Sequence, residues 1–310
     1  MSKRLVSVVV NKWYECDPII GALINDGLLT PRLPLPWPTF ISHPHARPEQ
    51  LPKPPTEGSN KPRLRFEVNG TAFEIWCISD LLEGLDQSGK VQSSSKVKME
   101  HMATIFAAQT PDLVIAMGTA AYPSADYENG SVVVGTRVFM HDGGTPGDDS
   151  NWHSDWFDQV IDSPLKREIF DVFVATWTVP GAPVLNNFIV PPLYPVLMGH
   201  LFASYDYAAL GTINVWDPAN YDTADRKTVE TYRSQHDGSF AKSLETTHGL
   251  IRAAVPEVPF LFISGISNRM LHFSDEVAPR IYAQRTASAH NAGVVLGTMM
   301  PAIAASWASA

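Results

Sequence analysis

Short, almost wholly apolar runs recur along the chain and predict buried strands. The first is Leu5 to Val10, and later ones are Asp112 to Met117, Ser131 to Met140 and Pro259 to Met270. Runs of this length that are rich in β-branched residues are typical of strands buried on both faces. Small or polar residues end or follow these runs, as expected where an open α/β sheet presents side chains at the carboxyl ends of its strands.

Helical patterns separate these strands. The predicted helices are Ser93 to Ala108, Thr223 to Ser234, Glu245 to Ala254 and the alanine-rich, apolar stretch Ala287 to Trp307. The pair Asn69-Gly70 predicts the turn of a hairpin over Leu64 to Ile78, and Leu210 to Val215 predicts a further short strand. Strands that alternate with helices and end in small residues are typical of a layered α/β fold.

Residues 30–63 differ from the rest of the chain because they hold ten of its 25 prolines. Proline disfavours both helix interiors and central strands, so this stretch is expected to be irregular, on the surface or against another subunit. The chain has 310 residues, of which 45% are hydrophobic, enough for one large core. We therefore expect a single domain over residues 1–310 with a proline-rich insertion at about 30–63.

The formal net charge of −9 narrows the range of partners. A surface with an excess of carboxylates does not neutralise the phosphates of nucleic acids or anionic membranes. The apolar runs are shorter than a membrane span, and Cys16 and Cys77 are too few for a disulfide framework. The N-terminus lacks a secretory signal pattern, so the prediction is a soluble cytoplasmic protein that binds small molecules and copies of itself.

Six short motifs follow one another in a recognisable order. They are VNKWYECDP with Glu15, Gly118-Thr119-Ala120-Ala121, Arg137 to Asp142, Gly211 to Pro218, Leu244-Glu245 and Ile266-Ser267-Asn268. In this order the chain resembles the nucleoside phosphorylase and nucleosidase superfamily, and most closely its methylthioadenosine/S-adenosylhomocysteine nucleosidase branch. The resemblance implies a three-layer α/β fold in which helices flank a central mixed sheet.

The resemblance also implies roles for individual residues. Cleavage of an N-glycosidic bond builds positive charge on the sugar and negative charge on the base, so a site must hold the ribose hydroxyls and accept the charge of the base. By resemblance, Glu245 with its neighbour Leu244 binds the ribose, and Glu15 activates the attacking water as a general base. Thr119 supplies a hydroxyl beside the nucleophile.

Each of these residues also has a plain structural interpretation. Glu245 could be a first-turn glutamate favoured by the helix dipole, and Glu15 an ordinary loop carboxylate with Asp17 as a rival for its position. Three further substrate contacts implied by the resemblance, for which core packing is the alternative, are Trp216, Asn220 and Phe273.

Asn268 departs from the family pattern. The matching aspartate in the nucleosidases lends a proton to the purine, whereas an amide forms hydrogen bonds and does not act as an acid. Three outcomes are open. The base leaves without protonation, as a pyrimidine or a modified base would; another acid such as Asp217 or His272 takes over; or the protein binds a nucleoside without cleaving it.

The choice between water and phosphate depends on positive charge. Phosphorylases of this superfamily carry an arginine after the first strand and another just before the Gly-Ser or Gly-Thr strand end. Here the first loop, NKWYECDP, contains no arginine, and Ala116 stands at the position of the second arginine. A phosphate dianion needs charge-assisted donors, so water is the expected nucleophile, with Arg63, Arg65 and Lys96 as possible sources of charge from elsewhere.

The predicted function is therefore hydrolysis of a nucleoside or nucleoside-like N-glycosidic bond. The alternatives are phosphorolysis, with phosphate as co-substrate, and a non-catalytic nucleoside-binding protein. No cofactor is expected. The pairs His141-Asp142, His153-Asp155 and His236-Asp237 lack the spacing of known metal motifs, so no metal site is predicted.

Overall fold

The computed structural model describes residues 4–25, 28–29, 61–82, 95–123, 129–141, 159–175, 188–189, 196–200, 226, 229–230, 232–235, 241–245, 247–272, 276 and 281–306. Its strands are β1 (Leu5–Val10), β2 (Ile24–Asn25), β3 (Leu28–Leu29), β4 (Leu64–Val68), β5 (Thr71–Cys77), β6 (Leu113–Tyr122), β7 (Val132–Gly135), β8 (Arg137–His141), β9 (Val160–Asp162), β10 (Phe188–Ile189), β11 (Val196–His200), β12 (Ala241–Glu245) and β13 (Phe260–Arg269). Its helices are α1 (Trp13–Leu23), α2 (Ile78–Leu82), α3 (Ser95–Ala108), α4 (Arg167–Ala175), α6 (His248–Ala254) and α7 (Ile281–Ser306).

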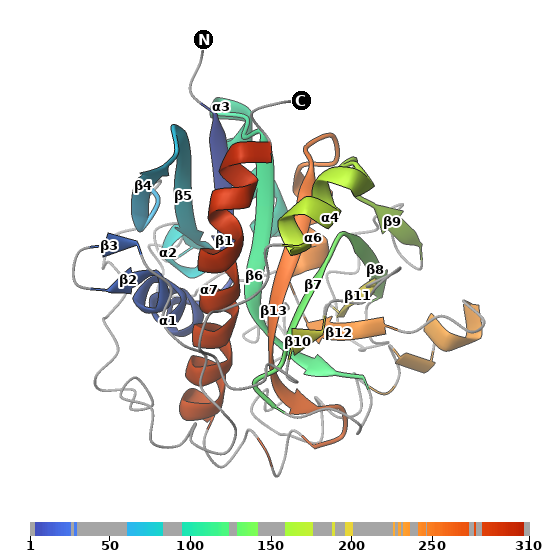
Figure 1. Cartoon of the computed structure of the whole chain (residues 1–310). Helices are drawn as coiled ribbons and strands as arrows, with labels where there is room; N and C mark the ends of the chain where they lie inside the picture. Colours follow the sequence, from blue (N-terminus) through green and yellow to red (C-terminus); the bar gives the residue numbers. More distant parts are fainter. Residues whose placement is uncertain are drawn as a thin grey trace.

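Strand β6 is the centre of a mixed sheet that has eleven strands in the described part of the chain. It runs parallel to β1 and to β13, and at Ala121 it meets β12 in antiparallel orientation. From β1 the sheet continues to β5 and β4, from β13 to β7 and β10, and from β12 to β11, β8 and β9 (Figure 1). The branch that begins with β1 thus joins the first half of β6, whereas β12 and β13 meet it at Ala121 near its end.

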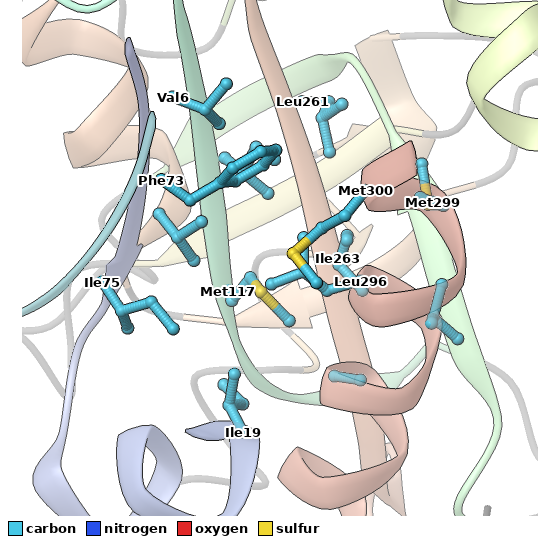
Figure 2. Packing of buried hydrophobic residues seen from close by; sticks show 14 of the residues in the cluster. Val6, Ile19, Phe73, Ile75, Met117, Leu261, Ile263, Leu296, Met299 and Met300 are labelled. Carbon is cyan, nitrogen blue, oxygen red and sulfur yellow. The ribbon is translucent and has the colours of Figure 1, made fainter. Parts of the chain in front are cut away.

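Helices cover both faces of this sheet. Along the central strands, successive side chains enter different hydrophobic clusters, as the alternation of a strand requires. Met117 and Ile263 pack with Leu296 of α7 on one face, where α1 and α4 also contribute (Figure 2). Phe262 packs with Met102 of α3 on the other face, which α6 also covers. The three-layer α/β fold predicted from the sequence is confirmed.

Several predicted elements are present as expected. The strand at Leu5–Val10 and the hairpin of β4 and β5 are formed, and Asn69 and Gly70 have φ angles of 48° and 83°. A two-residue turn of this kind needs positive φ at both positions, which asparagine and glycine tolerate best. The apolar C-terminal helix begins earlier than predicted, at Ile281, and packs on α1 and β13.

Four predictions of local structure were wrong. The stretch Ser131 to Met140 forms two strands because the chain changes partner at Thr136: β7 pairs with β13, and β8 pairs with β11. Strand β6 does not end at Met117 but continues to Tyr122, since β13 pairs with it that far. Glu245 ends β12, and the helix predicted from it begins at His248. Glu15 lies in the first turn of α1, not in a loop.

Some predictions concern residues outside the described part of the chain. These are most of the proline-rich insertion at 30–63 and the strand predicted for Leu210 to Val215. The described residues of the helix predicted for Thr223 to Ser234 are helical. The organisation as a single domain stays a prediction. None of the described helices is both long and apolar enough to cross a membrane.

Gly265→Ala is expected to destabilise the protein by about 3 kcal/mol, the upper part of the range for overpacked cores. A Cβ atom at Gly265 would lie 2.0 Å from the backbone oxygen of Ser288, so α7 would have to move away from β13. Gly118→Ala is the matched control in the same sheet, because its nearest atoms would lie 3.5 Å away. Urea unfolding measures both changes, and equal losses of stability would contradict the close packing of α7.

Candidate functional site

The carboxylate of Glu15 lies against the end of β6. Its Oε1 accepts hydrogen bonds from the Thr119 backbone N–H at 2.9 Å and from the Thr119 hydroxyl at 2.5 Å, and its Oε2 accepts one from the Lys12 N–H at 3.3 Å. Glu15 is only 6% exposed. A Cβ atom at Gly118 would lie 3.5 Å from both carboxylate oxygens, an ordinary van der Waals contact, so the carboxylate packs against this position. The structure thus joins two predicted site residues that are 104 positions apart.

Asp17, the rival of Glu15, has a different partner. Its carboxylate binds the guanidinium of Arg63, which also binds Asp80 with an Nη2 to Oδ1 distance of 2.6 Å. Arg65 is exposed and pairs with Glu74 at 3.3 Å. Both arginines considered as sources of positive charge are therefore engaged in ion pairs, and the side chain of Lys96 lies outside the described set.

Glu245 closes β12 and begins the turn into α6. Its Oε2 accepts a hydrogen bond from the Thr247 N–H at 2.7 Å, and its Oε1 accepts one from the His248 N–H at 2.5 Å. The carboxylate, 7% exposed, thereby satisfies N–H groups that the start of a helix leaves without intrahelical partners. The neighbouring Leu244 pairs with Ala121 of β6. Glu245 is thus held beside the end of the same central strand.

Asn268 approaches β6 from the opposite edge. It also pairs with Ala121, after a register shift that follows Ile266 in β13. Because adjacent strands are about 4.8 Å apart, the backbones of Leu244 and Asn268 are separated by roughly 10 Å across Ala121. The side chain of Asn268 is buried; its Oδ1 accepts a hydrogen bond from the Ser267 hydroxyl, and its Nδ2 donates one to the Arg269 carbonyl, both at 3.0 Å.

His248 is a buried imidazole next to Glu245. Its Nε2 lies 4.0 Å from Oε2 of Glu245, and its Nδ1 lies 3.4 Å from the Ser264 hydroxyl. Burial lowers the pKa of His248 to about 3, and a hydrogen bond with the backbone of Met117 acts in the opposite direction. His248 is therefore packed in the interior, and its imidazole is neutral at neutral pH.

This depressed pKa predicts a pH dependence of stability. In the unfolded chain His248 binds a proton below its ordinary pKa of 6.5, whereas in the folded protein it stays neutral down to about 3. Acid therefore favours the unfolded state, and this residue is expected to remove about 1.4 kcal/mol of stability per pH unit below 6.5. Urea unfolding between pH 7 and 5 should show a shallower decline for His248→Gln than for the wild type, and parallel curves would contradict this.

Lys98 of α3 is a residue that the sequence analysis did not select. Its side chain is 1% exposed, and burial lowers its pKa well below the usual range, with Lys12 adding to the effect. The charges of Glu245 and Glu15 act in the opposite direction and raise the pKa. The sequence did indicate that Lys98 is buried. Met102 follows it by four residues and Ile105 follows Met102 by three, so the three side chains lie on one face of the helix.

Other predicted site residues lie outside the described part of the chain. These are Trp216, Asn220, Phe273 and the alternative acid Asp217, whose roles stay predictions. His272 is half-buried in the turn that follows β13. Of the three His-Asp pairs, only the backbone of His141 is described; across the described residues, no three His, Cys, Asp or Glu side chains gather in a group suited to a metal.

Comparisons with known proteins bear on the fold. No family model and no curated protein matches the sequence. The methylthioadenosine/S-adenosylhomocysteine nucleosidase of S. pneumoniae, solved with a transition-state inhibitor, has 10% identity and a TM-score of 0.56, covering 96% of this chain and 99% of its own. The nucleosidase of Colwellia psychrerythraea, in complex with adenine, has 12% identity and a TM-score of 0.53, covering 97% and 96%.

A second kind of hydrolase has the same architecture. The futalosine hydrolase of Helicobacter pylori has 12% identity and a TM-score of 0.52, and the match covers 96% of this chain and 97% of that one. At such identities the likeness concerns the fold, and function needs its own argument. The chain therefore shares the fold of these nucleosidases and of futalosine hydrolase, the fold that the order of its motifs predicted.

Proposed function

We propose that this protein hydrolyses the N-glycosidic bond of a nucleoside or nucleoside-like substrate. The observation that carries the proposal is the buried Glu15 carboxylate, held by both donors of Thr119 at the end of β6. The fold supports it, since the structures compared above are those of nucleosidases and of a futalosine hydrolase. The substrate is accordingly a small molecule.

Glu15 has the position of a general base. Two hydrogen bonds from Thr119 fix the orientation of its carboxylate. A water molecule at the carboxylate would give up its proton as it attacks the anomeric carbon. Positioned bases of this kind raise the reaction rate by a factor of about 10²–10⁴.

The same contacts favour water over phosphate as the nucleophile. A phosphate at the end of β6 would need hydrogen-bond donors, and those of Thr119 are already bound to Glu15. A phosphate dianion would also meet the negative charge of that carboxylate. Arg63 and Arg65 are engaged in ion pairs with carboxylates and do not supply free positive charge to a phosphate. This also favours hydrolysis over phosphorolysis.

Glu245 and Asn268 would hold the two parts of the substrate. An ionised carboxylate has about four acceptor positions, which suits a group that caps α6 and receives two vicinal ribose hydroxyls. On the other edge of β6, the amide of Asn268 would form a hydrogen bond with the base. Because an amide donates no proton to a departing base, the best substrates are those whose base leaves without protonation, unless Asp217 or His272 supplies the acid.

The second candidate function is nucleoside binding without cleavage. The observation in its favour is Asn268 itself, since both polar atoms of its amide are bound within their own strand. A protein with this fold that lacks the acid could retain Glu245 for the sugar and have lost turnover. Phosphorolysis remains the third, with phosphate as co-substrate.

We also propose a setting for the reaction. The residues at the site suit a reaction that needs no cofactor, because a carboxylate base and a water suffice for hydrolysis. Cys16 and Cys77 are buried free thiols, which supports a reducing compartment such as the cytoplasm. Self-association is proposed from the sequence alone.

A panel of purine and pyrimidine nucleosides tests the proposal. The free base and the reducing sugar are measured after incubation in phosphate-free buffer and again with added phosphate. Hydrolysis predicts equal amounts of both products without phosphate. Release of base only when phosphate is present would mean phosphorolysis, and calorimetric binding without any release would establish the binding protein.

A further inference from the structure

Lys98 has a buried amino group whose hydrogen-bonding capacity is unused among the described residues. It lies in the first turn of α3, and its Nζ is fully buried and has no hydrogen-bond partner among the described residues. A buried charge without a partner is strongly unfavourable, so such groups are rare and point to a partner that arrives from outside. An ammonium offers three donors and no acceptor, so that partner must be an acceptor.

Helix α3, which carries Lys98, packs on α6, the helix that follows Glu245. The charges that act on its ammonium are those of Lys12, Glu245 and Glu15. The two carboxylates already receive backbone N–H groups, Glu15 from Lys12 and Thr119 and Glu245 from the start of α6. Neither is bound to the ammonium of Lys98 by a hydrogen bond.

We propose that Lys98 binds an anionic oxygen group, a carboxylate or a phosphate ester, that belongs to the nucleoside substrate. The inference rests on the proposed function in one respect, namely that the ligand is a nucleoside. An anionic oxygen compensates the buried charge, whereas a neutral hydroxyl would leave it unbalanced. Burial and Lys12 both disfavour the charged form of Lys98 in the free protein, and an anionic ligand reverses this effect.

The same chemistry could come from free phosphate, but the site favours a group carried by the substrate. The donors of Thr119 are bound to Glu15, so they are not available to a separate phosphate dianion. An anionic group attached to a nucleoside needs only one such contact, because Glu245 and the base contacts hold the rest of the molecule. Lys98 would then select substrates by charge.

Calorimetry with matched nucleosides tests this selection. The probes are uridine against orotidine and adenosine against adenosine 5′-monophosphate, each titrated into the wild type, Lys98→Met and Lys166→Met, the last an exposed lysine as control. In the wild type and the control, the anionic member of at least one pair should bind about tenfold or more tightly than the neutral one, as expected for a charge-assisted hydrogen bond. Lys98→Met should remove the difference and keep or raise the melting temperature.

Three outcomes would overturn the inference. Neutral nucleosides could bind as tightly as anionic ones, or Lys98→Met could retain the preference for the anion. Inorganic phosphate could bind in a Lys98-dependent manner and accelerate base release, which would make the oxyanion a co-substrate. Calorimetry reports binding whether or not cleavage follows, so these results do not decide whether the protein hydrolyses its substrate. Absence of binding by every nucleoside would contradict both proposals.

Discussion

Glu15→Gln is expected to lower kcat for base release by about 10²–10⁴-fold, the usual contribution of a positioned general base. Glutamine has nearly the same shape, and its carbonyl oxygen can still accept the two hydrogen bonds from Thr119. Its amide does not take a proton from water, so the chemical step is lost while the substrate still binds. Initial rates of base release, with KM determined alongside, measure this loss.

Asp17→Asn is the control for this variant, since it changes the same chemical group two residues away on α1. Asp17 binds Arg63 and does not contact Thr119, so its removal should cost stability and leave kcat within a few-fold of wild type. Thermal unfolding of both variants separates the two effects. If Glu15→Gln keeps wild-type turnover, or if Asp17→Asn loses as much, Glu15 is not the base.

Glu245→Gln is expected to lower kcat/KM for a ribonucleoside by about 100-fold or more. A carboxylate that accepts two hydroxyls forms charge-assisted bonds worth about 1.5–3 kcal/mol each, and the neutral amide loses most of this. The variant should also lose about 1 kcal/mol of stability, since Glu245 caps α6 through Thr247 and His248. The two consequences need separate measurements.

A 2′-deoxynucleoside separates the ribose contact from the helix cap. If Glu245 binds the 2′-hydroxyl, the deoxy substrate has already lost that bond, and Glu245→Gln should cost it much less than it costs the ribonucleoside. Such a cycle isolates the interaction between the side chain and the hydroxyl. Equal losses for the two substrates would assign Glu245 to the cap of α6 alone.

The sheet was largely predictable from the sequence, and the helices less so. Strands such as Leu5–Val10 consist of β-branched residues, so their local preference and their burial agree. Helix α1 was missed because Pro18 lies inside it, and proline in a helix interior ordinarily argues against a helix. The break at Thr136 depends on which strands pair on either side, information that comes from distant parts of the chain.

The site residues that belong to the ordered motifs were predictable from the sequence. The resemblance led to Glu15 and Thr119, and the structure shows the contact between them. Lys98 was not selected although it lies on the apolar face of its helix. The carboxylates that act on it, Glu15 and Glu245, belong to α1 and β12, which are distant in the sequence. The hydrogen bonds of Asn268 with its own strand depend on the register shift in β13, which no local pattern reveals.

A crystal structure of Glu15→Gln with a bound nucleoside tests the central claim most directly, because the variant should bind the substrate and not consume it. We predict the ribose hydroxyls on the carboxylate of Glu245, the anomeric carbon facing residue 15 beside Thr119, and the base on the side of β6 where Asn268 lies. A nucleoside bound away from the end of β6, with Glu245 contacting only the start of α6, would contradict this prediction.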